Sequence, residues 1–127
     1  MSDFKQIVEL FNNEFSSLKD EFCLFNLSVK EASESKLDYI WHPGVYIWWH
    51  PDKGVVRVGR HLINSRKRAL EHISYNTGGI IKELSEDNKT RVFLFNIKNI
   101  EKIHWVAALE IYFELKLEPS VKAGRLG

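Results

Sequence analysis

The chain has 127 residues, a hydrophobic content of 44% and a formal net charge of +1. This length and composition indicate one packed domain rather than a disordered chain. The single cysteine excludes an internal disulfide framework, and no apolar run approaches the ~20 residues of a membrane span. Because the first residues also lack the apolar core of a signal peptide, we expect a cytoplasmic protein with no membrane partner.

Hydrophobic periodicity and turn residues predict the elements of the first half of the chain. In chain order these are a helix at Phe4–Leu18, a candidate strand at Phe22–Val29, a polar connection at Glu31–Asp38, and two strands at Gly44–Trp49 and Val55–Val58. The segment between the two strands, His50–Gly54, contains Pro, Asp and Gly at turn positions. The strands are therefore predicted to form a β-hairpin.

The second half of the chain predicts more helices and one strand. A helix is predicted to begin at Arg66, where Asn64 or Ser65 can cap it, and Gly78-Gly79 ends this helix or its continuation. A short helix at Ile80–Glu86 and a strand at Thr90–Ile97 follow. The last element is a helix at Ile103–Leu117, which Pro119 stops. The last helix is apolar nearly all round, which predicts a buried element. The order predicts an α+β fold, with a small, largely antiparallel β-sheet flanked by helices.

One segment of the chain is strongly basic, although the net charge of the whole chain is nearly zero. Between Arg57 and His72 there are five Lys or Arg residues, one acid and two histidines: Arg57, Arg60, Arg66, Lys67, Arg68, Glu71, His61 and His72. A local positive field steers a polyanion even when the whole protein is neutral. This basic segment therefore predicts a phosphate-binding surface, with an ordinary solvated helix face as the alternative.

Four side chains are candidates for chemistry, each with a plainer alternative. Tyr46 lies in an aromatic strand, where a tyrosine is usually a packing residue. Arg68, His72 and Tyr75 share one helical stripe, which is also typical of solvated surface. Glu110 emerges from a mostly apolar helix face, and an unpaired buried carboxylate is costly, so it needs either an arginine or a metal ion. A structural salt bridge with Arg68 is the alternative there.

Other chemistries lack their motifs. The five histidines and one cysteine show no zinc-ligand spacing, and neither a dinucleotide-binding glycine motif nor a phosphate-binding lysine loop is present. We therefore expect no small-molecule cofactor.

The residues singled out above resemble the GIY-YIG nuclease superfamily. The resemblance rests on Gly44-Val45-Tyr46, a gap of ten residues, Arg57-Val58-Gly59, an Arg68 and His72 four residues apart, and Glu110 nine residues before Pro119. It implies a β-β-α-β-α core in a nuclease domain at residues 41–127, preceded by an N-terminal helical extension at residues 1–40. It further implies a metal-dependent endonuclease that acts on nucleic acid, with DNA as the expected partner.

The resemblance also implies a role for each candidate. Glu110 would hold one Mg²⁺ (or Mn²⁺), Arg68 would contact a phosphate oxygen, and Tyr46 would orient or deprotonate the attacking water. His72 would act as a relay or phosphate ligand. Further candidates for nucleic-acid binding are Arg57, Arg60, His61, Arg66 and Lys67, of which His61 is also a spare base. Arg57, Arg60 and the metal would favour the Tyr46 phenolate.

Three positions depart from the family pattern. Arg57 stands where the family has a second tyrosine, and Lys122 stands where it often has an asparagine. Arg68 lies one residue farther from Gly59 than is usual, so Arg66 or Lys67 can take part of its role. A catalytically degenerate nucleic-acid-binding module on the same scaffold is therefore the alternative function.

Overall fold

The structure is a computed structural model that describes residues 2–74 and 78–122. Its elements in chain order are α1 (Phe4–Glu14), the 3₁₀ turn η1 (Lys19–Glu21), β1 (Phe22–Ser28), α2 (Val29–Glu34), β2 (Gly44–His50), β3 (Gly54–His61), α3 (Ser65–Glu71), α4 (Ile80–Ser85), β4 (Arg91–Ile97), the 3₁₀ turn η2 (Ile100–Lys102) and α5 (Ile103–Leu117). The fold is α+β, which confirms the prediction. From β2 onward the order is β-β-α-β-α, with the short α4 inserted before β4.

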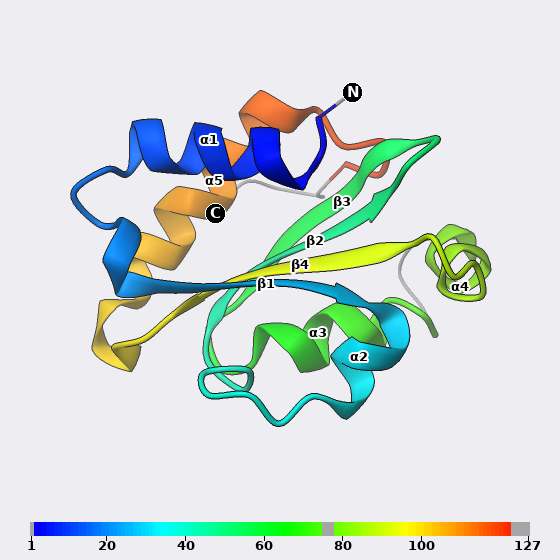
Figure 1. The fold of residues 1–127 in the computed structure, drawn as a ribbon, viewed down its shortest axis with the longest axis horizontal. Coiled ribbons are helices and arrows are strands. Elements are labelled where there is room, and N and C mark those ends of the chain that lie inside the picture. Colours follow the sequence, from blue (N-terminus) through cyan, green and yellow to red (C-terminus); the bar gives the residue numbers. More distant parts are fainter. Residues whose placement is uncertain (1, 75–77, 123–127) are drawn as a thin grey trace.

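The four strands form one antiparallel sheet in the order β1-β4-β2-β3. Helices α1 and α5 cover one face, and α2 and α3 cover the other (Figure 1). The sequence alternation of β4 explains this two-sided burial, because successive side chains of a strand point to opposite faces. Phe93 and Phe95 belong to the core cluster under α1 and α5, whereas Val92 and Leu94 belong to the cluster under α2 and α3.

The first 40 residues, expected as a helical extension, also supply a strand. β1 pairs with β4 along its whole length, so the sheet runs across the expected boundary at residue 40. Helix α1 ends at Glu14 rather than Leu18, and it inserts Ile7 and Phe11 into the core.

Helix α2 replaces part of the polar connection that the sequence predicts at Glu31–Asp38. Local capping explains the helix, since the Glu31 backbone amide donates to Ser28 Oγ (3.1 Å) and the Ser28 amide donates to Glu31 Oε1 (2.8 Å). This reciprocal pair satisfies two amides that the first turn of a helix leaves without partners. Ala32 then packs against the sheet.

Two helix predictions need correction. Helix α5 is buried on one side only: Leu115, for example, is 63% exposed, so its apolar composition overstates its burial. Helix α3 ends at Glu71 rather than near Gly78, and Gly79 instead precedes α4 in a left-handed conformation (φ 86°). Residues 75–77, including Tyr75 of the predicted stripe, lie outside the described residues.

Candidate active site

The two short motifs of the hairpin meet across the strands. Tyr46 on β2 and Gly59 on β3 are direct partners in the antiparallel register. A Cβ atom on Gly59 would collide with the Tyr46 hydroxyl and Cζ and would lie 2.9 Å from Cε1. The ring of Tyr46 therefore lies over Gly59, which requires a residue without a side chain at that position. Because β3 is the edge strand of the sheet, the Tyr46 ring extends over β3 and its hydroxyl points toward the edge of the sheet.

His72 is the partner of the Tyr46 hydroxyl. The hydroxyl oxygen lies 2.6 Å from His72 Nε2, and the residues Tyr46 and His72 are 2% and 1% exposed. His72 follows the last residue of α3, where Ala69 and Ser65 also face the sheet, so the helical spacing points the imidazole at β2. Two residues 26 positions apart in the chain thus form one buried hydrogen-bonded pair that can pass a proton.

Charged groups surround this pair and act on it in opposite directions. Burial raises the pKa of the Tyr46 hydroxyl, because the phenolate is poorly solvated, and the nearby Glu110 carboxylate raises it further. Arg57 lowers this pKa by its charge and its hydrogen bonding, and Arg68 lowers it by its charge. The net pKa shift is upward. Burial thus outweighs the guanidiniums, so the arginines alone do not make the phenolate the favoured form; that they do so together with a bound metal ion stays a prediction.

Arg57 stands close to Tyr46 for a structural reason. It is the partner of Trp48 in the hairpin register, which places it on the same face as Tyr46. Its Nη1 donates to the Lys122 carbonyl oxygen (2.7 Å), so the segment after α5 holds the guanidinium in place. That segment also runs along β3, where the Val121 amide donates to the Val56 carbonyl (2.7 Å).

Glu110 has a cation partner, but the partner is Arg60 rather than Arg68. Arg60 Nη1 lies 2.9 Å from Glu110 Oε1, and the whole Glu110 residue is only 4% exposed. Arg60 is the partner of Val45 in the hairpin and so lies on the face that α5 covers. Arg68 instead contacts Glu71 one turn along its own helix, at 3.4 Å.

The chemistry of Glu110 fits a magnesium ion in one binding mode. Among the described residues, no group of three or more His, Cys, Asp or Glu side chains could enclose a metal. Mg²⁺, however, is usually held by one or two carboxylates while it keeps waters and binds a substrate phosphate. A single buried carboxylate meets that requirement once its contact with Arg60 is exchanged for the ion.

The remaining predicted residues separate into two groups. Arg66 turns away from Arg68: its Nη1 donates to the carbonyl oxygens of Ala32 (3.3 Å) and Ser35 (3.1 Å) and so ties α3 to α2. His61 Nδ1 accepts the Asn64 amide (3.0 Å) and orders the turn before α3. Lys67 is exposed on the outer side of α3. Arg66 and His61 therefore have structural partners, whereas Lys67 is available to a ligand.

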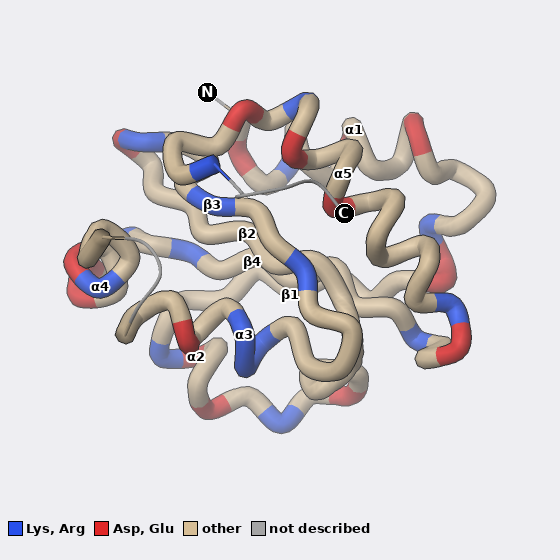
Figure 2. The backbone as a smooth tube through the Cα atoms, turned by 180° about the vertical axis from the view of Figure 1, so that it is seen from behind, with Lys and Arg blue, Asp and Glu red and all other residues tan. Residues whose placement is uncertain are grey.

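The basic residues of β3 and α3 lie along adjoining segments of the backbone, as Figure 2 shows. Arg57 and Arg60 come from β3, and Arg66, Lys67 and Arg68 come from α3. A shallow groove of about 470 Å³ follows α3 and is lined by Asn64, Lys67, Glu71 and neighbouring residues. Their side chains separate, however: Arg60 pairs with Glu110 of α5, whereas Arg66 turns toward α2 and Arg68 contacts Glu71.

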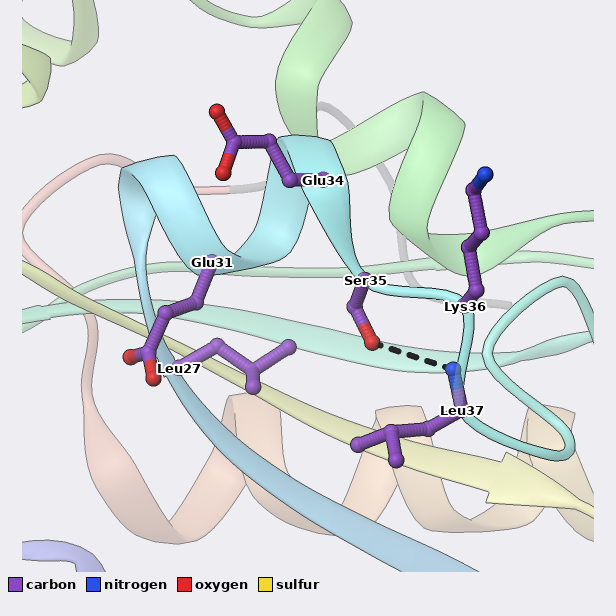
Figure 3. A pocket seen from close by; sticks show the side chains of 6 residues that line it. All are labelled: Leu27, Glu31, Glu34, Ser35, Lys36 and Leu37. Carbon is purple, nitrogen blue, oxygen red and sulfur yellow. Dashed lines mark hydrogen bonds between the residues drawn. The ribbon is translucent and has the colours of Figure 1, made fainter.

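A second groove, of about 500 Å³, contains none of the predicted site residues. It lies beside α2, and its walls are Leu27, Glu31, Glu34, Ser35, Lys36 and Leu37 (Figure 3). Among these residues, the Leu37 amide donates to Ser35 Oγ (3.3 Å). Its ionisable side chains do not converge on a common point in Figure 3, so we assign no chemistry to it.

Sequence reasoning missed a buried polar group next to the hairpin. Asn96 on β4 is fully buried, accepts the Ser65 hydroxyl at its Oδ1, and donates from Nδ2 to the Tyr39 carbonyl (2.9 Å). A Cβ on Gly44 would collide with Asn96 Oδ1, so this network explains the first glycine of the hairpin. The available signal was a polar residue at an inward position of an apolar strand, because buried polar groups need partners.

Across residues 2–74 and 78–122, none of the helices has the length and apolar character needed to cross a bilayer. No protein-family model, no curated protein and no solved structure matches the chain.

Proposed function

We propose that this protein is a metal-dependent endonuclease that hydrolyses phosphodiester bonds in DNA. The observation that supports the proposal is the buried Tyr46–His72 hydrogen bond, with Arg57, Arg68 and Glu110 close enough for their charges to act on the Tyr46 hydroxyl. These are the groups that move a proton and balance phosphate charge. We also propose a cytoplasmic site of action, because one cysteine suits a reducing compartment.

Tyr46 and His72 would manage the proton of the attacking water. In this scheme the water donates to the Tyr46 oxygen while the Tyr46 hydroxyl donates to His72 Nε2, which lies 2.6 Å away. Because the pKa of Tyr46 is raised, a standing phenolate is disfavoured at neutral pH. Transfer through the hydroxyl to an imidazole avoids the need for that phenolate.

The arginines would hold the phosphate. Arg68 would contact a nonbridging oxygen, where a permanently charged planar guanidinium is better suited than an ammonium. Arg57, at the position of the second family tyrosine, would add positive charge beside Tyr46. Arg60 and Lys67 would bind phosphates on either side of the one that reacts.

Glu110 would hold the Mg²⁺ or Mn²⁺ ion, which when bound would supply positive charge to the phosphate oxygens. Arg60 would leave Glu110 when the ion enters and would turn to a neighbouring phosphate. In the absence of metal, Arg60 keeps the carboxylate from being buried without a counter-charge.

The direct test is cleavage of supercoiled, linear and branched DNA with Mg²⁺, Mn²⁺ or EDTA. The parent protein should cut only with a divalent ion, and Glu110→Gln should not cut under any of these conditions. A matched variant is Glu114→Gln, a second buried carboxylate one turn along α5. If Glu110→Gln cuts at the parent rate, Glu110 is not the metal ligand.

A catalytically degenerate DNA-binding module is the second candidate. It is favoured by the Arg60–Glu110 ion pair, which already supplies a charge partner to the carboxylate, and by Arg57 in place of a tyrosine. Such a module would bind DNA with affinity that falls as salt rises. Binding of this kind without cleavage of any of the three substrates would establish it.

A further inference from the structure

An exposed aromatic loop lies next to the proposed nuclease site and is not used by the proposed chemistry. Leu37, Tyr39 and Trp41 are all exposed on the segment that enters β2, and Leu62 and Ile63 are exposed on the neighbouring β3–α3 turn. The Ser65 amide donates to the His42 carbonyl (3.2 Å), which joins the two segments. Large exposed apolar side chains that gather in one place indicate a binding surface.

The charges around this loop favour a polyanionic partner. The Arg66 guanidinium lies over the Trp41 ring, 5.5 Å from its centroid, and the Lys98 ammonium lies 6.0 Å from the Tyr39 centroid. Asp38 is the acid within the loop, and Lys36 offsets it. A cation against one side of a ring, with 48% of Trp41 still exposed, leaves ring surface on which a base can stack.

The loop is held rigid by buried hydrogen bonds. Tyr39 has a positive φ of 68°, a conformation that is uncommon for a bulky residue. Its carbonyl accepts from Asn96 Nδ2 (2.9 Å) and from the His42 amide (3.1 Å). His42 Nδ1 in turn donates to the Ile97 carbonyl (2.9 Å). Because the strained conformation is already present without a ligand, stacking on the loop would cost little ordering entropy.

The position of the loop matches a strand of nucleic acid that continues past the proposed reaction centre. Gly44 pairs with His61 two residues from the Tyr46–Gly59 pair, which is roughly 7 Å along the strand. Arg66, in the first turn of α3, contacts Trp41, and Arg68, two residues farther along the same helix, is close enough to Tyr46 for its charge to lower the pKa of that hydroxyl. A phosphate backbone lying over α3 would thus place a base at Trp41 and a phosphate near Arg68.

We propose that Trp41 and Tyr39 form a stacking platform for an unpaired base, so that the substrate is single-stranded DNA or DNA with an unpaired segment. This inference rests on the proposed nuclease function and specifies its substrate class. A base pair inside a duplex cannot stack on Trp41, because both of its faces are covered by neighbouring pairs; only the two terminal pairs of a blunt duplex have a free face. The platform therefore distinguishes unpaired from paired substrates.

The test is a titration with oligo(dT) of twelve nucleotides and with a blunt duplex of the same length, in EDTA, followed by fluorescence anisotropy. Trp41→Leu should weaken oligo(dT) binding about 5- to 100-fold, the range of one base–aromatic stack, and should change duplex binding less than twofold. Trp41→Phe should retain most of the affinity. The matched control is Trp105→Leu, because Trp105 also has a lysine 5.5 Å from its ring but lies at the start of α5; it should bind like the parent.

Each other outcome overturns the platform. If Trp41→Leu binds oligo(dT) like the parent, or loses as much affinity for the duplex as for oligo(dT), no base stacks on Trp41. The nuclease proposal then stands if the parent protein still hydrolyses a small phosphodiester such as bis(p-nitrophenyl) phosphate. If the parent binds no nucleic acid and hydrolyses no diester, both proposals fail. If the parent self-associates and Trp41→Leu abolishes this, the surface is an interface between copies of the chain.

Discussion

The Tyr46–His72 pair gives the most informative single change, Tyr46→Phe. The substitution keeps the ring over Gly59 and removes only the hydroxyl. From sequence alone the expected loss of stability is at most about 1 kcal/mol, the net worth of one hydrogen bond. The structure raises this figure, because the hydroxyl oxygen and His72 Nε2 are 2.6 Å apart and both residues are buried. Removal of a buried partner leaves a desolvated nitrogen behind, which costs about 1–3 kcal/mol.

The assay is urea unfolding, with Tyr112→Phe as the control. Tyr112 is a partly buried tyrosine on α5, and within the described part of the chain its hydroxyl has no hydrogen bond. We expect Tyr46→Phe to lower the free energy of unfolding by about 1–3 kcal/mol and Tyr112→Phe by less than about 0.5 kcal/mol. Equal losses for the two variants would refute the special status of the Tyr46 hydroxyl.

The pH dependence of stability follows from the raised pKa of Tyr46. Its ordinary value, ~10, applies to the unfolded chain, whereas burial raises the pKa in the folded protein. The protonated hydroxyl therefore contributes stability that is fully present below pH ~10 and is lost as pH rises through the higher folded pKa. Between these two pKa values the free energy of unfolding of Tyr46→Phe should fall less steeply with pH than that of the parent. The contribution of Tyr112, whose pKa is also raised, should remain in the variant.

Activity gives a second result for the same variant. Loss of a group that positions or transfers a proton should reduce the cleavage rate about 10²- to 10⁴-fold. A rate within threefold of the parent would show that Tyr46 takes no part in the chemistry. If His72→Ala or His61→Ala then loses activity, the base is an imidazole.

Further predictions follow from the neighbouring contacts. Arg68→Lys should lose about two orders of magnitude in cleavage rate. The free energy of unfolding of this variant should stay within about 0.5 kcal/mol of the parent's, because the Arg68–Glu71 ion pair is partly exposed. A cleavage rate like that of the parent would make Arg68 a surface charge. Arg60→Gln should bind Mn²⁺ more tightly in a thermal-shift titration, since it removes the cation that competes for Glu110, and unchanged or weaker binding would argue against a metal at that carboxylate. Gly59→Ala should lower the free energy of unfolding by about 1–3 kcal/mol. In a double-mutant cycle with Tyr46→Ala the two losses should be less than additive, because removal of the ring makes room for the new methyl group. Additive losses would contradict the packing of the ring over the glycine.

The sequence by itself determined the elements whose cause is local. The hairpin from Gly44 to His61 follows from its turn residues and its β-rich runs, and the strand at Arg91–Ile97 follows from its alternation, because both signals act between near neighbours. The polar residue inside that strand, Asn96, was visible in the sequence, but its partners on the Tyr39 loop and α3 were not.

Tertiary structure decided which groups meet. The sequence suggested Arg68 as the salt-bridge partner of Glu110, whereas the structure pairs Glu110 with Arg60, because Arg60 lies on the face of the sheet that α5 covers. In the same way, the upward pKa shift of Tyr46 reflects burial by packed elements, which outweighs the arginines that the sequence places nearby. Pairing and desolvation depend on how segments far apart in the chain pack, and no pattern of neighbouring residues specifies that packing.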